Sequence, residues 1–390
     1  MRRWIIALLL CLTTIGAFAQ TDKLPLPQLP DSQKQGLMTY LHRHRATPEE
    51  YVIAKFDDHD VVFLGEQHRI KENVELIQRL IPLCYRSGIY FLGYEFARRV
   101  DQPLVDSLLN APSYDEMLAR KILFNQFVFW GYQEYADVFK AAWQVNHNLP
   151  QGARRFRILA LSNSPDWSLV KTEADRDNGA VMTRVWHGED EGDWAKVLLS
   201  EVVDKHEKAL VYSGIHHAFT EYRQPISDKG KFIRFGDVRC GNYVFDKIGK
   251  RAMTIYLHAP WNSSEGYDAG MVYAADGVID AVMAALGTRG YPCRFDVRGT
   301  PFGKITGETS IYKYGYDHFT LENYCDGYIF QMPISYYTGV TPIKDFINES
   351  NLEIARQQSP NPALRTASAQ DFNDGIAQDA NMAKRLSKFK

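Results

Sequence analysis

Short apolar runs alternate with stretches of helical periodicity over residues 59 to 100. Val61 to Leu64 is a continuous apolar run typical of a buried strand, and Ile89 to Tyr94 is a second. Between them, residues 70–86 place apolar side chains three and four positions apart, which predicts an amphipathic helix. This strand–helix–strand order predicts parallel strands joined by right-handed crossovers.

The alternation continues along the chain and predicts one α/β domain over residues 59–348, with a mostly parallel central sheet flanked by helices. Helical stretches are expected at 166–185 and 193–206. Further strands are expected at 156–161, 209–212, 232–235, 253–257 and 327–332. Residues 101–150 are helical in composition and rich in aromatic residues, so we expect them to form a helical lid over the carboxyl ends of the strands.

The two flanking segments differ from this domain in composition. Residues 20–58 begin Pro-rich and then carry helix-start signals, which predicts an extended and helical lead-in. Residues 349–390 are polar and rich in Ala, Gln and Asn, and we expect a tail that lies outside the core.

The first 19 residues have the pattern of a cleavable secretory signal. A basic start precedes an apolar stretch from Ile5 to Phe18, and Ala17 and Ala19 fit a small-residue cleavage site. A lipoprotein signal through Cys11 is less favoured, because no small residue stands just before that cysteine. We therefore expect an exported, periplasmic or extracellular protein, cleaved near Ala19.

Charge and hydropathy narrow the classes of partner. The formal net charge is −2 and the chain has no Lys/Arg block, which argues against nucleic acid. No second apolar run approaches the roughly 20 residues of a membrane-spanning helix, so no span is expected in the mature chain. An exported chain with an even number of cysteines after cleavage permits two disulfides, and free buried thiols are equally compatible. The cysteines in question are Cys84, Cys240, Cys293 and Cys325.

Acidic and imidazole side chains follow three of the predicted strands. Glu66 and His68 come at the end of the first, Glu95 ends the second, and His216-His217 follow the run from Ala209. Ligands of open α/β sheets bind outside the carboxyl ends of the strands, so these side chains are candidates for chemistry. A carboxylate can orient a neighbouring imidazole, and imidazole suits general-base catalysis near neutral pH. Each residue also has a purely structural interpretation, as a hydrogen-bonded loop histidine or a buried ion pair.

Standard catalytic motifs are absent. The sequence has no G-x-S-x-G elbow, no H-E-x-x-H pair, no Walker loop and no G-x-G-x-x-G fingerprint. Serine hydrolases of the ordinary type, zincins and nucleotide-binding folds are therefore disfavoured.

The strand-end motifs resemble those of the erythromycin esterase, ChaN-like and Tiki superfamily. Leu64-Gly65-Glu66-Gln67-His68, Glu95-Phe96 and Gly214-Ile215-His216-His217 carry the likeness, which is good from about residue 60 to 220 and fainter to Gln331. Weaker similarities to the esterase-like members lie in the middle and late parts of the chain. They comprise Trp130, Glu134, Trp143, Asn146, Arg176-Asp177, Met182 and Asp326 to Phe330.

The resemblance implies roles for individual positions. Glu66, His68, Glu95 and His217 match catalytic or metal-facing positions. Arg98, Trp130, Glu134, Arg176 and His216 match accessory polar or substrate-binding positions with a looser fit. Two positions depart from the esterases: Arg69 stands where they commonly have Gly, and Gly214 stands where they have a His. Because of these departures, the resemblance supports the site that the whole superfamily shares better than it supports the opening of macrolide rings.

The resulting hypothesis is an exported hydrolase of small-molecule or peptide substrates. His68 acts as general base on water, oriented by Glu66 or Glu95, and His217 or Arg176 stabilises the oxyanion. In a metal-dependent form of the same hypothesis, Glu66, His68, Glu95 and His217 hold Zn or Mn. The alternative is a haem- or ligand-binding periplasmic protein of ChaN-like type, and a third option is a catalytically silent scaffold.

Overall fold

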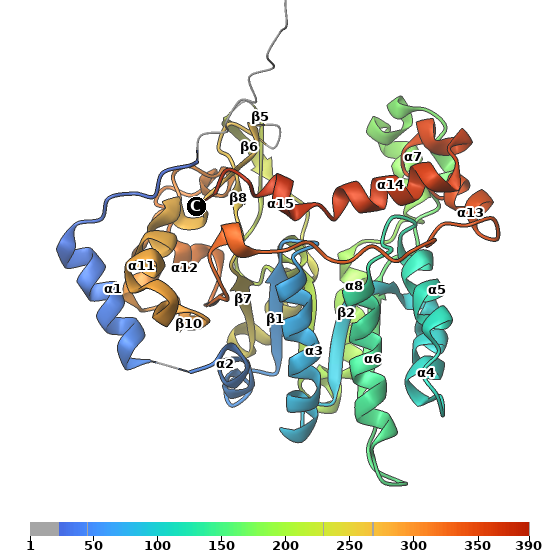
Figure 1. Ribbon diagram of the computed structural model, residues 1–390, viewed down its shortest axis with the longest axis horizontal. Coiled ribbons are helices and arrows are strands. Elements are labelled where there is room, and N and C mark those ends of the chain that lie inside the picture. Colours follow the sequence, from blue (N-terminus) through green and yellow to red (C-terminus); the bar gives the residue numbers. More distant parts are fainter. Residues whose placement is uncertain (1–22, 45, 229, 267–268, 390) are drawn as a thin grey trace, which may run out of the picture.

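The computed structural model describes residues 23–44, 46–228, 230–266 and 269–389, apart from the side chain of residue 289. Its centre is a mixed sheet that is parallel except for one antiparallel edge pair (Figure 1). In spatial order the strands are β10 (Cys293–Asp296), β11 (Gly327–Phe330), β7 (Ala252–Leu257), β1 (Val61–Glu66), β4 (Ala209–Gly214), β2 (Phe91–Arg98) and β3 (Arg157–Ser162). The predicted fold class, a mostly parallel α/β sheet flanked by helices, is confirmed.

Helices cover both faces of this sheet, because successive side chains of the buried strands point to opposite sides. Val62 and Leu64 of β1 join one core, while Val61 and Phe63 join the other. The first core includes side chains of α2 (Pro48–Lys55), α3 (Lys71–Arg86), α4 (Gln102–Asn110), α5 (Glu116–Gln126) and α6 (Gln133–His147). The second includes side chains of α1 (Asp31–Arg43), α8 (Glu191–Glu201), α9 (Ile215–Ala218), α10 (Cys240–Ile248), α11 (Val278–Leu286) and α12 (Leu321–Tyr324).

The strand order places β4 between β1 and β2, although β1 and β2 are consecutive in the sequence. Val61 and Phe91 both pair with Ala209, so the three strands start in register. Glu66 pairs with Gly214 at the other end. The parallel register therefore brings the carboxyl ends of β1, β4 and β2 to one edge of the sheet.

The insertion at 101–150 is helical, as expected, and consists of α4, α5 and α6. Much of α6 packs beside α3 on the sheet face. The turn between α5 and α6 carries Trp130 to the carboxyl ends of the strands, where its ring lies 5.1 Å from that of His68. Tyr135 of α6 approaches the same edge, where its hydroxyl donates to Glu66.

The strand expected at 232–235 lies outside the central sheet. It forms β6 (Lys231–Phe235), which pairs antiparallel with β5 (Pro225–Asp228) in a separate hairpin. A second small pair consists of β8 (Trp261–Asn262) and β9 (Met271–Val272). The helical stretch expected at 166–185 is broken into short 3-10 turns and α7 (Gly179–Val185).

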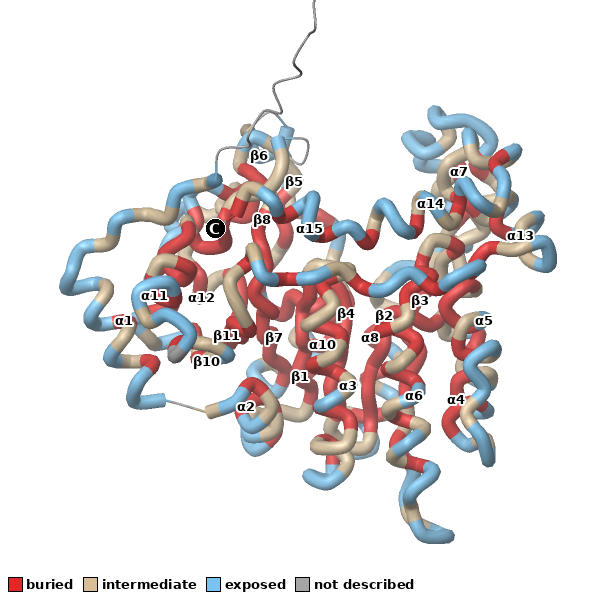
Figure 2. The backbone as a smooth tube through the Cα atoms, viewed as in Figure 1, coloured by how far each residue is buried: buried red, intermediate tan, exposed pale blue. Residues whose placement is uncertain are grey.

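The expectation that residues 349–390 stay outside the core is wrong. This segment forms α13 (Leu352–Gln357), α14 (Ala369–Asp379) and α15 (Met382–Arg385), and it crosses the end of the sheet (Figure 2). Phe372 and Ile376 are four residues apart on α14 and are buried, as is Phe389 beyond α15. Average composition hid these few apolar side chains, which recur at helical spacing within a polar background.

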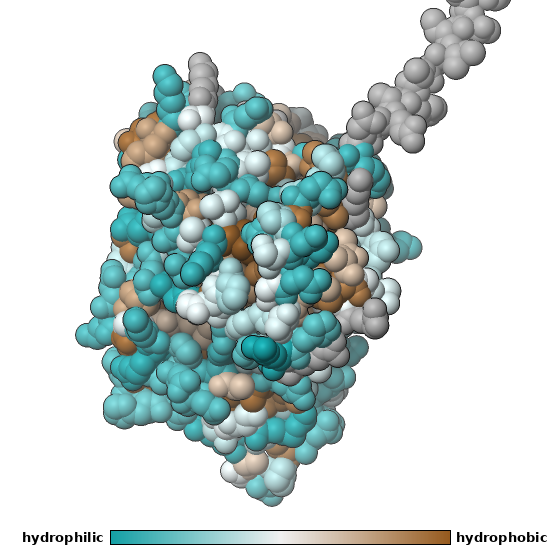
Figure 3. All heavy atoms as spheres, turned by 90° about the vertical axis from the view of Figure 1, so that its left-hand side faces the viewer, coloured by the Kyte–Doolittle hydropathy of each residue, from teal (hydrophilic) through white to brown (hydrophobic). Residues whose placement is uncertain are grey.

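The proposed signal sequence and Cys11 lie outside the described residues. Cys84, Cys240, Cys293 and Cys325 are all free thiols. In the described part of the chain, no helix has the length and hydropathy needed to cross a bilayer. The face shown in Figure 3 is largely hydrophilic, with hydrophobic atoms in small scattered groups.

Candidate functional site

Four side chains singled out from the sequence converge at the carboxyl edge of the sheet. Glu66 is the last residue of β1, and His68 lies in the turn that follows it. Glu95 lies in β2, and His217 lies in α9, directly after β4. The pairing of β2 with β3 shifts register between Tyr94 and Arg98, and such irregularities re-aim side chains next to active sites. The strand ends, and not sequence proximity, assemble this group.

Glu66 holds His68 through one ring nitrogen. His68 Nδ1 lies 2.8 Å from Glu66 Oε1, and the Glu66 side chain is fully buried. Two tyrosine hydroxyls also donate to this carboxylate: Tyr135 to Oε1 at 2.6 Å, and Tyr212 to Oε2. Burial and the negative charge of Glu66 raise the pKa of both tyrosines well above its ordinary value, so both stay protonated donors. The buried charge is thus stabilised by hydrogen bonds without a cation.

The turn after β1 aims the imidazole of His68. Arg69 adopts a φ of 71°, a left-handed conformation that costs a residue other than glycine about 1–2 kcal/mol. The Arg69 side chain is fixed by Tyr132 Oη at 2.9 Å, by Asp379 at 3.0 Å and by the face of Trp130. These contacts hold a turn that glycine would adopt freely, which explains how this position tolerates an arginine.

Gly214 provides the space that His68 occupies. A Cβ at position 214 would lie 2.7 Å from Cε1 and 2.9 Å from Nε2 of that ring. The ring also packs edge-on against Phe96 and Trp130. His68 is therefore locked in orientation, with Nδ1 on Glu66 and Nε2 facing the space between the strand ends.

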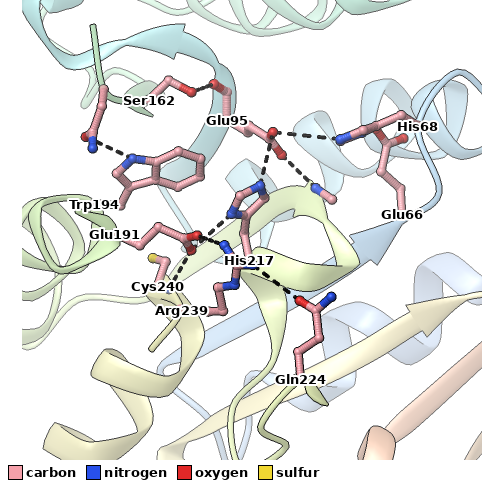
Figure 4. Close-up of polar contacts among 12 residues, drawn as sticks. Glu66, His68, Glu95, Ser162, Glu191, Trp194, His217, Gln224, Arg239 and Cys240 are labelled. Carbon is pink, nitrogen blue, oxygen red and sulfur yellow. Dashed lines mark hydrogen bonds and ion pairs between the residues drawn. The ribbon is translucent and has the colours of Figure 1, made fainter. Parts of the chain in front are cut away.

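Glu95 lies between the two imidazoles (Figure 4). Its Oε2 accepts a 2.7 Å hydrogen bond from the backbone N–H of Gly214. Its Oε1 lies 3.5 Å from His217 Nε2 and 3.8 Å from His68 Nε2. Both distances exceed the 2.7–3.2 Å typical of N–H···O bonds, so Glu95 contacts the two rings mainly through its charge.

His217 is held on its other side by an acidic residue that the sequence analysis missed. His217 Nδ1 lies 3.0 Å from Glu191 at the start of α8, and Glu191 in turn pairs with Arg239 at 2.6 Å. Burial acts to lower the pKa of His217, but Glu191 and Glu95 outweigh it and raise the value to about 9. Burial likewise acts to raise the pKa of Glu191, and His217 and Arg239 outweigh it and bring the value to about 2. At neutral pH this half of the site holds an imidazolium between two carboxylates.

These groups open into a cavity of about 380 Å³. Its lining consists of Glu66, Gln67, His68, Gly214, Ile215, His216, His217, Asn262, Gly270, Met271 and Arg385. His216 points to Tyr312 Oη at 2.9 Å, and burial together with the charge of His217 lowers its pKa to about 3, so it is neutral. A larger hollow of about 900 Å³ between α5 and residues 344–354 contains none of the candidate residues.

Four of the predicted accessory residues do not line this cavity. Arg98 pairs with Asp101 at 2.7 Å, and Glu134 accepts hydrogen bonds from the backbone N–H and hydroxyl of Thr341. Arg176 is exposed in a 3-10 turn. Trp130 is buried and acts on the site by packing against His68.

The donor atoms do not form a metal site. Across the described residues, no group of three or more His, Cys, Asp or Glu side chains is arranged to hold a metal ion. The oxygens of Glu66 are occupied by Tyr135, Tyr212 and His68, and His217 is an imidazolium between Glu191 and Glu95. In this arrangement the four side chains serve as hydrogen-bond and ion-pair partners of one another and of their neighbours, and the mechanism below is written without a metal.

Comparison with known proteins yields only distant likenesses. No protein-family model and no curated protein matches the chain. A Bacillus cereus protein of solved structure is 12% identical, with a TM-score of 0.46 over 78% of this chain and 97% of that one. The type III effector HopBA1 is 16% identical, with a TM-score of 0.34 over 55% and 83%. ChaN of Campylobacter jejuni, solved with cofacial heme, is 14% identical, with a TM-score of 0.33 over 56% and 89%. Likenesses at this level carry no argument about activity.

Proposed function

We propose that this protein is a hydrolase in which the Glu66–His68 pair activates a water molecule. The observation that carries the proposal is the orientation of His68, whose ring lines the cavity. Nδ1 faces a buried carboxylate, and Nε2 is turned toward Gly214 and Glu95, with Glu95 Oε1 at 3.8 Å. A carboxylate on Nδ1 favours the tautomer with the proton on that nitrogen, which leaves the Nε2 lone pair free. A general base of this kind contributes roughly 10²–10⁴-fold to the rate.

The proposed reaction is acyl transfer to water. His68 Nε2 removes a proton from water while the water oxygen attacks the carbonyl carbon of the substrate. The negative charge that develops lies on the carbonyl oxygen. The imidazolium of His217 stabilises that charge. Protonated His68 then gives its proton to the leaving oxygen or nitrogen as the bond to the acyl carbon breaks. Glu95, 3.8 Å from His68 Nε2, stabilises the imidazolium formed in between.

The cavity sets an upper limit on the substrate. At about 380 Å³ it lies near the lower end of the roughly 300–1,000 Å³ common for ligand sites. Small esters or amides fit this space better than a macrolide ring. Arg176, the other oxyanion candidate, does not line the cavity, so the proposal assigns this role to His217.

Hydrolysis of small esters and short peptides by the full chain tests the proposal. We expect His68→Ala to lower kcat/KM by about 10²–10⁴-fold. His318→Ala serves as the matched control, because His318 is an exposed histidine that does not line the cavity. Equal rates in both variants would show that His68 is not the base.

Two further measurements separate the alternatives. We expect the activity to survive treatment with a chelator, and elemental analysis to find less than one metal ion per chain. An activity that is lost on chelation and restored only by Zn or Mn would contradict the metal-free step. A haem titration that gives a His68-dependent Soret band, together with no turnover, would replace the hydrolase by a haem-binding protein.

A further inference from the structure

We infer that the C-terminal segment supplies two cations, Arg385 and Lys388, that select substrates carrying a negatively charged group such as a carboxylate or phosphate. The inference rests on the proposed function and names the substrate class of the same cavity. The segment concerned, residues 381–389, includes α15, which lies at the end of the sheet toward which β1 runs (Figure 1).

This segment is anchored to the domain. Met382, Leu386 and Phe389 are buried, at 1%, 2% and 0% exposure. The backbone N–H of Leu24 donates to the carbonyl of Lys388 at 2.7 Å, and Lys23 Nζ donates to the carbonyl of Phe389 at 3.0 Å. Side chains that alternate with these anchors are therefore held at fixed places above the strand ends.

Arg385 lines the cavity that contains His68 and His217. Among the described residues no carboxylate forms an ion pair with the guanidinium of Arg385. Arg69, by contrast, forms an ion pair with Asp379 at 3.0 Å. A guanidinium presents a planar fork of N–H donors that matches carboxylate and phosphate oxygens. With no ion-pair partner among the described residues, this fork at the cavity is available to a ligand.

Lys388 adds a second cation to the same rim. A Cβ at Gly270, a lining residue, would lie 3.2 Å from Lys388 Nζ, so the ammonium stands beside the cavity wall. No acidic partner within ion-pair distance of this ammonium occurs in the described chain. Arg385 and Lys388 therefore place two positive charges at the rim of the cavity.

The acidic residues of the site have other partners than Arg385 and Lys388. Glu66 is buried and held by three donors, and Glu95 is bonded to the backbone of Gly214. Glu191 is offset by Arg239. A substrate that places its anionic group on Arg385 and Lys388 and its acyl group at His68 contacts both cations and the base together.

Binding of non-reacting anions by the full chain tests the inference separately from turnover. Calorimetric titration with inorganic phosphate and with succinate is expected to detect binding, and Arg385→Ala to weaken it by about 10-fold or more, with Lys388→Ala causing a smaller loss. Lys384→Ala is the matched control, because Lys384 is an exposed cation of the same helix that does not line the cavity. Arg385→Glu is expected to abolish the titration.

A pair of chromogenic esters extends the test to catalysis. With 4-nitrophenyl acetate and the singly charged 4-nitrophenyl succinate, Arg385→Ala is expected to raise KM for the charged ester more than for the neutral one. Equal weakening by Lys384→Ala, or no anion binding by the unaltered chain, overturns the inference. Anion binding with the expected variant pattern but no hydrolysis refutes the proposed function alone, and hydrolysis without charge preference refutes the anion site alone.

Discussion

The histidine–carboxylate groups of His68 and His258 follow two paired strands of this sheet but differ in exposure: His68 lines a cavity, whereas His258 is fully buried. His258 follows β7 as His68 follows β1, and β1 and β7 are paired. His258 Nδ1 lies 2.6 Å from Tyr328 Oη and Nε2 lies 3.2 Å from Asp280, with the histidine fully buried. In His68 only Nδ1 faces such a partner at hydrogen-bond distance, and the side chain is 29% exposed.

The comparison shows that residue types alone do not define a site. Both groups contain an imidazole, a carboxylate and at least one hydrogen-bonded tyrosine hydroxyl. In His258 both ring nitrogens have close partners, so the group can only stabilise the fold. The ring of His68 lines a cavity, and its Nε2 lies 3.8 Å from its nearest carboxylate oxygen, beyond hydrogen-bond distance.

The largest expected effect is a split in activity between the two histidines. His68→Ala should reduce kcat/KM by about 10²–10⁴-fold with a cooperative unfolding transition retained. His258→Ala, assayed at a temperature where it remains folded, should keep kcat/KM within a few-fold. Steady-state kinetics with circular dichroism on both variants checks this. A large loss of kcat in folded His258→Ala would contradict the distinction between a catalytic His68 and a structural His258.

The second expected effect is that the variant with the smaller loss of activity, His258→Ala, has the larger loss of stability. His258→Ala leaves Asp280 and Tyr328 buried without their partner, and we expect a loss of about 3–5 kcal/mol in the free energy of unfolding. His68→Ala should cost less, because that ring is partly exposed. Denaturant unfolding of both variants measures the difference, and equal losses would mean that His68 is as structural as His258.

A third prediction concerns pH. The pKa of His217 is raised to about 9 in the fold, so its ion pairs contribute fully below its ordinary pKa of 6.5 and are lost as pH rises through about 9. Activity that depends on this imidazolium should fall over the same upper range. In Glu191→Gln the falling limb should move down by about 1–3 pH units, since one carboxylate is removed. A profile of kcat/KM against pH that does not move would remove His217 from the mechanism.

The smallest effect is expected for Tyr135→Phe. Glu66 keeps its bonds from Tyr212 and His68, so the loss should be about 1 kcal/mol in stability and several-fold in kcat/KM. Tyr114→Phe is a control, because the Tyr114 hydroxyl donates to the carbonyl of Ala136, away from the cavity. If the two variants behave alike in kinetics, the tyrosine support of Glu66 has no catalytic role.

The sequence was sufficient for most strands of the central sheet and for the residues at their ends, although it did not predict β10 and the strand it predicted at 232–235 lies in a separate hairpin. The apolar runs at Val61, Ile89 and Ala209 correspond to β1, β2 and β4, and helical spacing predicted α3, because burial on both sheet faces leaves a strong periodic signal. Glu66, His68, Glu95 and His217 followed from their positions after those runs, and the structure brings these four together.

The supporting residues could not be found in this way. Glu191 stands near the start of a helix, where acidic residues are common on exposed surfaces, and only tertiary packing places it against His217 and Arg239. Tyr135 and Tyr212 have the sequence pattern of core aromatics, and their hydroxyl partner is set by the distance between α6, β4 and β1. The anchoring of the C-terminal segment rests on a few apolar side chains in a polar stretch, which composition averages away.

The position of β4 between β1 and β2 has a consequence for how the protein is made. On the ribosome, Glu66 and Glu95 emerge long before the strand that must separate them, and the nascent chain has to avoid pairing β1 directly with β2. The imidazolium that offsets Glu95 and the glycine that admits His68 both arrive with that late strand. Recovery of the proposed activity during refolding would therefore require β4 to lie between β1 and β2.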